Sequence, residues 1–367
     1  MVSIARYDNI IGRRALVNLN IAAIDLFCGI GGLTHGLIKA GIPVVAGIDI
    51  DETCKYAYET NNRSNFICKD ISRELTGADL EALYPEGCIK ILVGCAPCQP
   101  FSTHTQKCKS RTFDEKWGLL YSFLNLIREV RPDVVSMENV PAIAKSKVFL
   151  DFVAGLEEQD YHLFWDKVYC PEYGVPQTRK RLVLLASKLG PIDIIPPTHT
   201  KDEYETVRGA IGKLEVIAAG EVSATDPFHR SRHLKDINLK RIRQSKPGGT
   251  WKDWDEALRC PCHKKESGKS YGGVYARMSW DTLAPTMTTQ FYNYGTGRFG
   301  HPEQDRALSL REGALLQTFP PKYDFIDPEL PFSIERLGTH IGNAVPVRLG
   351  IIIGRSILNH LEGMLNG

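Results

Sequence analysis

The 367-residue sequence lacks the features that define membrane or secreted proteins. No apolar run approaches the ~20 residues that a bilayer-spanning helix requires, so we expect no membrane partner. The N-terminal stretch "MVSIARYDNIIGRR" has no signal-peptide core, and the 10 cysteines show no framework spacing. These absences predict a cytoplasmic protein with free thiols.

The sequence also lacks a strong charge of either sign. The formal net charge is only +2, so a nucleic-acid surface would have to come from local clustering. Residues 225–252 contain such a cluster, in which eight basic residues face only two acidic ones. The basic residues are Arg230, Arg232, Lys235, Lys240, Arg241, Arg243, Lys246 and Lys252.

Short apolar runs alternate with helical patterns between about residues 21 and 187. The predicted strands are "IAAIDLF", "PVVAGIDI", "IKILVGC", "DVVSMENV", "YHLFWDKVYC" and "KRLVLLAS". Helical patterns such as "GLTHGLIKAG" and "WGLLYSFLNLIREV" lie between them, and another runs from about 51 to 61. This alternation predicts an α/β fold with a mostly parallel sheet and helices on both faces.

The pattern changes after the adjacent prolines Pro196 and Pro197. The chain is irregular, polar and rich in glycine and basic residues until about 290, and helical patterns then return in "RALSLREGALLQTF" and "VPVRLGIIIGRSILNHLEGML". We therefore predict a larger domain of residues 1–188, completed by 331–367, and a smaller domain of residues 189–330.

A glycine-rich turn, "DLFCGIGG", follows the first predicted strand. Gly29, Gly31 and Gly32 would let a ligand approach the backbone at a helix N-terminus. Asp49 ends the second strand, where a carboxylate can accept the hydroxyls of a ribose. The glycine spacing differs from the G-x-G-x-x-G of NAD enzymes and favours another adenosine cofactor. The alternative is a tight turn with an exposed acid.

The stretch "ILVGCAPCQPFS" ends a predicted strand with two cysteines. Cys95 and Cys98 could form a redox pair, although such pairs usually begin a helix, whereas a long polar loop follows here. We interpret Cys95 as a buried thiol and Cys98 as a candidate nucleophile at the edge where active sites of α/β sheets gather. The loop carries Lys107, Lys109, Arg111 and Lys116, which suits a lid over an anionic substrate.

Two further strand ends carry charged residues. Glu138 ends "DVVSMENV", where a partly desolvated carboxyl could hold or deliver a proton, or could simply cap the next turn. Arg179 and Arg181 alternate in "QTRKR" and would share one face, either beside a cleft or on a solvated edge strand.

The order of these motifs resembles that of a known family. "FCGIGG", "PCQPFS", "ENV", "QTRKR" and "GNAVP" are similar to the ordered motifs of the DNA (cytosine-5) methyltransferases. The resemblance covers about 21–363 and breaks only across 190–280, where the family varies because it recognises its target there. It implies a Rossmann-like methyltransferase fold that uses S-adenosylmethionine.

The resemblance also implies a reaction and roles for the site residues. Cys98 would add to carbon 6 of a cytosine swung out of duplex DNA, so that carbon 5 can accept the methyl group. Glu138 would donate a proton at ring nitrogen 3, and Arg179 would assist at the carbonyl edge of the base. Arg181 would support the catalytic loop.

The resemblance assigns a pocket for the methyl donor as well. Asp49, where a glutamate is commoner, would bind the ribose, and Ile50 stands where the family often has an aromatic residue. The remaining contacts would come from Phe27, Gly29, Gly31, Gly32, Asp70, Ile71, Leu120, Asn343 and Val345.

Double-stranded DNA is the expected partner, with two sets of contacts. The loop from Ser102 to Trp117 would clamp phosphates through Ser102, Lys107, Lys109 and Arg111. The basic segment of the smaller domain, the target-recognition domain, would read base edges, with Arg230, Arg232, Arg241 and Arg243 as candidates. Trp251 could approach DNA or be buried.

Several alternatives remain open from the sequence. The chain could methylate cytosine in tRNA, since a related branch shares the fold, or it could be a non-catalytic DNA-binding regulator. As a restriction–modification enzyme it would be a nucleoid-associated monomer with a cognate restriction endonuclease. We expect no metal, because "CPCH" at 260–263 has no second ligand pair nearby.

Overall fold

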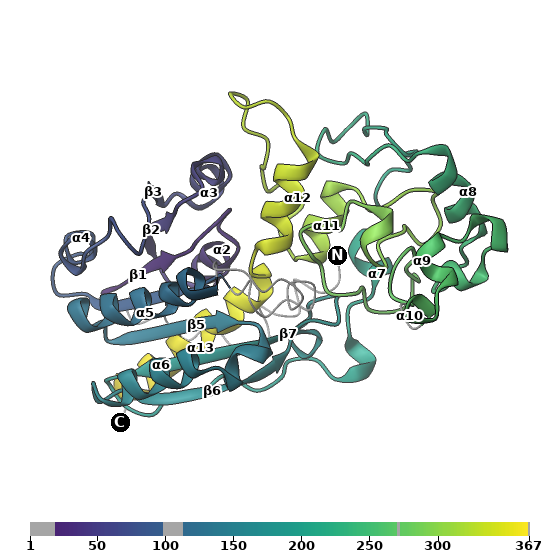
Figure 1. Ribbon diagram of the computed structural model, residues 1–367. Coiled ribbons are helices and arrows are strands. Elements are labelled where there is room, and N and C mark those ends of the chain that lie inside the picture. The colour runs from purple at the N-terminus through teal and green to yellow at the C-terminus, as the bar shows by residue number, and fades with distance from the viewer. Residues whose placement is uncertain (1–18, 98–112, 270–271, 366–367) are drawn as a thin grey trace.

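The computed structural model describes residues 19–97, 113–269 and 272–365, and its centre is a seven-stranded sheet (Figure 1). The strand order is β3-β2-β1-β4-β5-β7-β6. The strands are β1 (Ile21–Leu26), β2 (Val44–Asp49), β3 (Asn65–Cys68), β4 (Ile89–Gly94), β5 (Val134–Asn139), β6 (His162–Tyr169) and β7 (Lys180–Ser187).

The pairing confirms the predicted α/β fold with a mostly parallel sheet. β3, β2, β1, β4 and β5 pair in parallel, whereas β7 lies antiparallel between β5 and β6. The six predicted strands are all present. The sequence analysis missed β3, because its four residues, "NFIC", are too few to show a strand period.

Helices cover both faces of the sheet. Those of this region are α2 (Gly32–Ala40), α3 (Lys55–Asn62), α4 (Gly77–Glu81), α5 (Phe113–Val130), α6 (Lys147–Glu157) and α13 (Val347–Leu365). Successive strand residues face opposite sides. Ile24 and Leu92 belong to the core cluster with α4, α5 and α6, while Ala23 and Ile91 belong to the cluster with α2 and α13.

We call residues 189–330 the small region, and its secondary structure contrasts with that of the sheet. It has short helices and, among its described residues, isolated bridges instead of strands. The helices are α7 (Val207–Ile211), α8 (Asp236–Gln244), α9 (Pro261–Lys264), α10 (Glu266–Lys269) and α11 (Leu310–Leu316). Figure 1 shows α7–α11 on one side of the molecule, with α12 (Ile334–Asn343) between them and the sheet.

One apolar core joins the two regions. Cys28 and Tyr58, from the sheet side, belong to the same buried cluster as Phe228 and Phe291 of the small region and Ile341 of α12. The stretch Ile334–Met364 is long and apolar enough to cross a membrane, but 78% of its most apolar window is buried inside the protein. α12 and α13 are therefore core helices in this structure.

Candidate active site

The glycine-rich turn between β1 and α2 has an unusual backbone. Phe27, Gly29 and Gly31 have positive φ values of 59°, 50° and 82°. A non-glycine residue such as Phe27 adopts this conformation at a cost, and such residues cluster at ligand sites. A Cβ on Gly32 would lie 2.2 Å from the carbonyl oxygen of Val345, whereas one on Gly29 would meet nothing within 4 Å. The turn is thus tight on one side and open at Gly29.

Asp49 lies at the end of β2 and faces this turn. Its Oδ2 accepts a hydrogen bond from the Gly29 amide at 2.8 Å, and its Oδ1 accepts one from the Asp51 amide at 3.0 Å. Burial raises the pKa of the Asp49 carboxyl, and these two amides partly offset that rise. Ile50, the next residue, is 68% exposed. A fixed carboxylate beside an open apolar side chain suits a ribose with its attached base.

The other residues predicted to contact the methyl donor differ in how far their side chains are exposed. Asp70 follows β3, and its Oδ1 accepts bonds from the amide and hydroxyl of Ser72 at 2.8 and 2.6 Å. Ile71 and Leu120 are buried in the core cluster that contains α5. Asn343 is exposed at the end of α12, and Val345 is buried against Gly32. The ends of β1, β2 and β3 and the segment after α12 thus lie around one turn.

Sequence reasoning missed Asp25, which lies inside β1 next to this turn. Its Oδ2 accepts a hydrogen bond from the Thr34 hydroxyl at 2.7 Å, while its Oδ1 is buried and has no partner in the described part of the chain. Burial raises the pKa of Asp25 to about 7. The signal in the sequence was an aspartate within the apolar run "IAAIDLF", where an ionised side chain is costly.

Glu138 is the centre of the second part of the site. It ends β5, is only 2% exposed, and forms an ion pair with Arg181 of β7, whose Nε lies 2.8 Å from Oε1. The Cys95 thiol donates to Oε2 at 2.7 Å. Next to Glu138, the side-chain Nδ2 of Asn139 donates to the Ala96 carbonyl at 3.0 Å. These contacts hold the end of β5 against the chain that leads into Pro97 and Cys98.

Several predicted residues lie outside the described ranges. They are Cys98, Ser102, Lys107, Lys109 and Arg111. The structure therefore leaves the nucleophile and the basic loop as predictions, and it places only the segment that precedes them.

Arg179 precedes β7 and is held by neutral acceptors. Its Nη1 donates to Gln177 Oε1 at 3.2 Å and to the Met287 carbonyl at 3.1 Å. Its Nε is buried, and no described residue accepts from it. Burial, followed by the nearby charge of Arg181, lowers the pKa of the Arg179 guanidinium. A buried cation with an unused donor can bind an acceptor that enters the site.

The predicted DNA-reading arginines all make contacts within the protein. The Arg230 guanidinium lies 4.2 Å from the ring centroid of Phe332. Arg232 donates to Asn293 at 2.8 Å and pairs with Glu335 at 3.0 Å.

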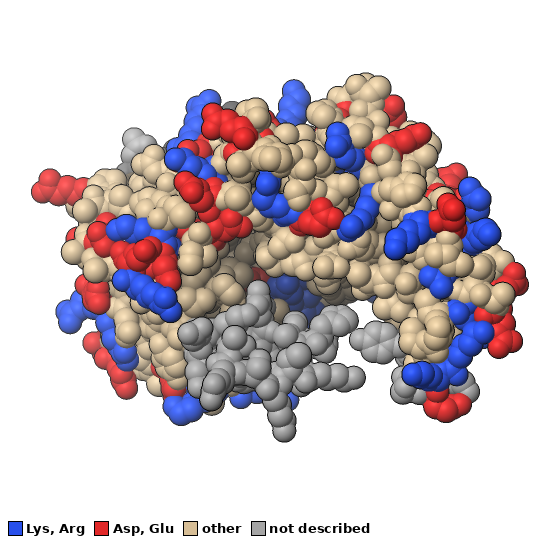
Figure 2. All heavy atoms as spheres, turned by 45° about the horizontal axis from the view of Figure 1, so that its top comes forward, with Lys and Arg blue, Asp and Glu red and all other residues tan. Residues whose placement is uncertain are grey.

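The two arginines of α8 differ from each other. Arg241 donates to the Leu258 carbonyl and to Asn238, both at 2.9 Å, within its own region. Arg243 is exposed and pairs with Asp305 at 3.3 Å. Figure 2 shows a hollow between the two regions and many basic side chains over the small region on this face. Trp251 is buried rather than displayed.

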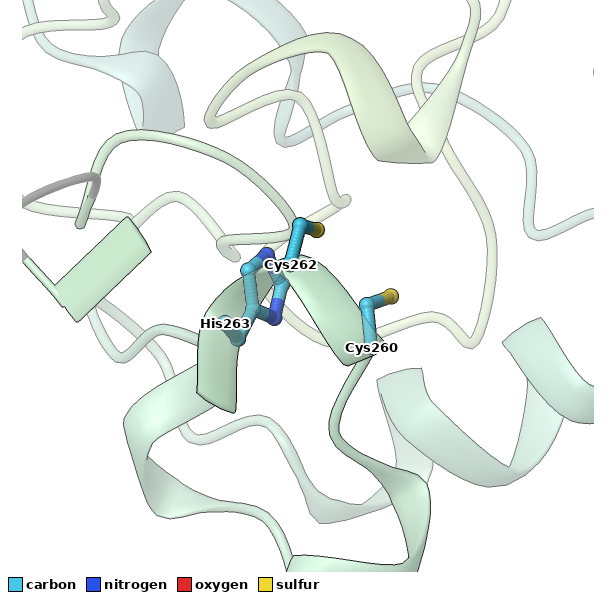
Figure 3. Close-up of side chains that lie close together, drawn as sticks. All are labelled: Cys260, Cys262 and His263. Carbon is cyan, nitrogen blue, oxygen red and sulfur yellow. The ribbon is translucent and has the colours of Figure 1, made fainter. Parts of the chain in front are cut away.

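The "CPCH" segment forms the N-cap and the first three residues of α9, and Figure 3 shows the side chains of Cys260, Cys262 and His263. Ligand atoms of Cys260, Cys262 and His263 lie within 4.8 Å of one another, and no fourth ligating side chain joins the group within the described ranges. The His263 ring stacks on Trp251 at 4.2 Å. Burial lowers the pKa of His263, as expected for an imidazole packed among aromatic rings. We therefore continue to predict no metal here.

Comparison with known proteins adds an independent finding. The family profile described as C-5 cytosine-specific DNA methylase matches residues 21–359. Type II methylase M.HgiDII of Herpetosiphon aurantiacus is 57% identical over 346 residues, which cover 94% of this chain and 96% of that protein. Type II methyltransferase M.PspPI of Psychrobacter sp. (strain TA137) is 30% identical, with coverage of 92% and 79%.

A solved structure shows the same fold. The Entamoeba histolytica methyltransferase EhMeth matches with a TM-score of 0.65 at 15% sequence identity, covering 93% of this chain and 99% of that one. At that identity the likeness concerns the fold alone.

Proposed function

We propose that this protein is a type II modification enzyme. The chain belongs to the C-5 cytosine-specific DNA methylase family, and it therefore transfers a methyl group from S-adenosylmethionine to carbon 5 of cytosine in DNA. Its similarity to a type II methylase across nearly the whole of both chains supports this role. The enzyme would act in the cytoplasm on nucleoid DNA, as a monomer, and would protect host DNA from a cognate endonuclease.

The reaction explains why a thiol is needed. Carbon 5 of cytosine is a weak nucleophile, so the Cys98 thiolate first forms a bond to carbon 6 and moves electrons to carbon 5. Carbon 5 then takes the methyl group as the donor's S–CH₃ bond breaks. A base finally removes the carbon 5 proton, and the Cys98–carbon 6 bond breaks. Carbon 6 is inaccessible in a duplex, so the base must leave the stack.

The observation that carries these roles is the placement of Glu138. Arg181 holds one of its carboxyl oxygens and Cys95 the other, and the adjacent Asn139 holds the chain two residues before Cys98. In this position Glu138 can hold a proton at ring nitrogen 3 and accept from the exocyclic amine. Arg179 supplies its unused Nε to the carbonyl edge of the base.

The residues around the glycine-rich turn fit the methyl donor. The open space at Gly29 admits a ligand, and the Asp49 carboxylate is positioned for ribose hydroxyls. Ile50 would contact the adenine, near Asp70, Ile71 and Leu120. Phe27, Gly31, Gly32, Asn343 and Val345 would shape the rest of the pocket. When bound, the donor supplies an electrophilic methyl group on sulfur.

DNA would lie between the two regions, with residues 189–330 as the target-recognition domain. Ser102, Lys107, Lys109 and Arg111 would clamp phosphates from the other side. Arg243 is the leading candidate for a direct contact because its own side chain is exposed and only the half-buried Asp305 competes for it, and Arg230 and Arg232 come next. Arg241 would support these residues from within α8.

Two experiments test the proposed mechanism. DNA with 5-fluorocytosine at the target should become trapped on the enzyme, because fluorine blocks the final loss of the carbon 5 proton. Cys98→Ser should abolish both trapping and methyl transfer while keeping specific DNA binding. Wild-type turnover in the serine variant would remove the covalent mechanism.

A third experiment tests the biological role. Expression in a host without cytosine methylation, followed by sequencing for 5-methylcytosine, should show one short duplex context modified throughout the genome. Methylation confined to tRNA, or no methylation by a well-folded protein, would instead favour the tRNA enzyme or the regulator.

A further inference from the structure

Two buried glutamines connect the donor side of the site to the base side. Gln177 lies three residues before β7, and Gln317 directly follows α11. Both side chains are 0% exposed. The Gln177 Nε2 donates to Gln317 Oε1 at 2.8 Å, so the two amides form a direct link. Buried amides that are fully bonded are rigid, because losing a partner leaves an unsatisfied polar group.

Gln317 fixes the segment that closes the donor side. Its Nε2 donates to the carbonyls of Ile341 at 2.8 Å and Ala344 at 3.0 Å. These carbonyls flank Asn343, and Ala344 directly precedes Val345, whose own carbonyl faces Gly32. The position of Gln317 therefore sets the position of the chain that packs on the glycine-rich turn.

Gln177 fixes the base side in the same way. Its Oε1 accepts from Arg179 Nη1 at 3.2 Å and from the Met287 amide at 2.9 Å. Its Nε2 also donates to the Leu316 carbonyl at 2.9 Å. The guanidinium that would face the base is thus oriented by the amide that bonds to Gln317.

The backbone groups at the two ends of this link determine which atom of each glutamine donates and which accepts. The Met287 amide can only donate, so the oxygen of Gln177 must face it. The carbonyls of Ile341 and Ala344 can only accept, so the nitrogen of Gln317 must face them. A flip of either amide would break bonds at both ends together.

We propose that Gln177 and Gln317 are positioning residues that couple the donor pocket to the Arg179 side of the target-base pocket. The proposal rests on the proposed roles of Val345 and Arg179. A substitution at Gln317 should therefore slow methyl transfer, and a substitution at Gln177 should weaken binding of the methyl donor. Each residue directly contacts only one of the two pockets.

Methionine replaces glutamine with similar length and no hydrogen bonds. We would compare Gln177→Met, Gln317→Met and the double variant with Gln159→Met. Gln159 is a half-buried glutamine that donates to the Gly155 carbonyl at the end of α6, away from both pockets, and serves as the control for the change from glutamine to methionine. Donor affinity without DNA and the rate of methyl transfer at saturating donor are measured separately, with unfolding midpoints as a folding check.

The proposal expects each single variant to weaken donor binding and to slow transfer, each by roughly 3- to 30-fold, and the double variant to be no worse than the poorer single. The control should match the wild type. If Gln317→Met changes only donor affinity, Gln177→Met changes only transfer, and the effects multiply in the double variant, the coupling is wrong.

A second variant covers the case in which the methionine proteins fold poorly. Gln177→Glu keeps the acceptor for Arg179 and Met287 but removes the donor to Gln317 and to the Leu316 carbonyl. In this background a further change at Gln317 should no longer alter the transfer rate, and a continued effect would overturn the proposal. Arg179→Ala, measured in parallel, distinguishes a failure of the glutamine coupling from a failure of the proposed role of Arg179. Unchanged transfer in that variant refutes the proposed role of Arg179 itself, whatever the glutamine variants do.

Discussion

The sheet region and the small region satisfy their buried backbone groups in different ways. In the sheet region, neighbouring strands pair their amides and carbonyls along ladders such as β1–β4 and β5–β7. The small region has only isolated bridges in its described part, so many carbonyls there have no strand partner. A buried carbonyl without a partner is costly, and another donor must reach it.

Buried arginines supply those donors in the small region. Arg277 donates to four backbone carbonyls at 2.7–3.1 Å, those of Ile242, Ser245, His301 and Gln304. Arg306 donates to the carbonyls of Ile217 and Ala307, both at 3.0 Å, and pairs with Glu312 at 2.7 Å. A guanidinium has five donors in one plane, which suits convergent loop carbonyls.

This difference changes how a basic composition should be interpreted. In the sheet region the buried Arg179 and the half-buried Arg181 lie at the proposed active site. In the small region, by contrast, the buried Arg277 and Arg306 donate to backbone carbonyls that have no strand partner, and Arg241 forms hydrogen bonds within its own helix and a nearby loop. A count of basic residues therefore overstates the surface that is free to meet DNA.

The largest expected effect comes from breaking one buried ion pair of the small region. Burial opposes ionisation of Glu312, yet the Arg306 charge lowers its pKa to about 2. Glu312→Gln would leave Arg306 buried without its counter-charge, so we expect a loss of about 3–5 kcal/mol in unfolding free energy. Urea denaturation at neutral pH measures it.

The control for that variant lies in the sheet region. Glu81→Gln removes the half-exposed partner of Lys90 and should cost at most about 1 kcal/mol. Similar losses in both variants would mean that burial does not decide how much an ion pair contributes to stability.

The next effect is a dependence of stability on pH that comes from His301. Its Nδ1 accepts hydrogen bonds from the amides of Glu303 and Gln304, so the ring must be neutral. Burial lowers its pKa to about 4, below the ~6.5 of an unfolded histidine. The stability it contributes is therefore complete above pH ~6.5 and is lost as the pH falls towards 4.

Between pH 7 and 5.5 this term amounts to about 1 kcal/mol. The measurement is the unfolding free energy as a function of pH in the wild type and in His301→Gln, whose side chain does not titrate. The variant should show a flatter profile over this interval, and parallel profiles would assign the pH dependence to other groups.

The smallest effect on stability is expected at the exposed Arg243. Removing its pair with Asp305 in Arg243→Ala should change the unfolding free energy by less than about 1 kcal/mol. If Arg243 meets a DNA phosphate, affinity should fall and the dependence of log K on log salt should lose roughly one unit of slope. Arg128→Ala, which removes an exposed pair with Glu158 in the sheet region, should leave DNA binding unchanged.

Much of the sheet region was predictable because its signals are local. Apolar runs and glycine positions defined six of the seven strands, and "GLTHGLIKAG" became α2 with Gly41 as its C-cap. The carboxyl ends of the parallel strands β1, β2, β4 and β5 meet at one edge. The glycine-rich turn, Asp49 and Glu138 could therefore be assigned to one site from the sequence.

Other features were not predictable in this way. Helix α6 was missed, and α11 is shorter than the helical pattern around it suggested. Gln317 drew no attention, because nothing in "LLQTFP" shows that its amide meets a glutamine 140 residues earlier in the chain.

The sequence by itself determined the order of the elements and the motifs at their ends, because periodicity and turn chemistry depend on neighbouring residues. Only the tertiary structure decided which arginines are buried, that Arg181 faces Glu138, and that Gln177 bonds to Gln317. Those contacts pair residues far apart in the chain, and a polar side chain becomes a core residue only when its distant partners satisfy it.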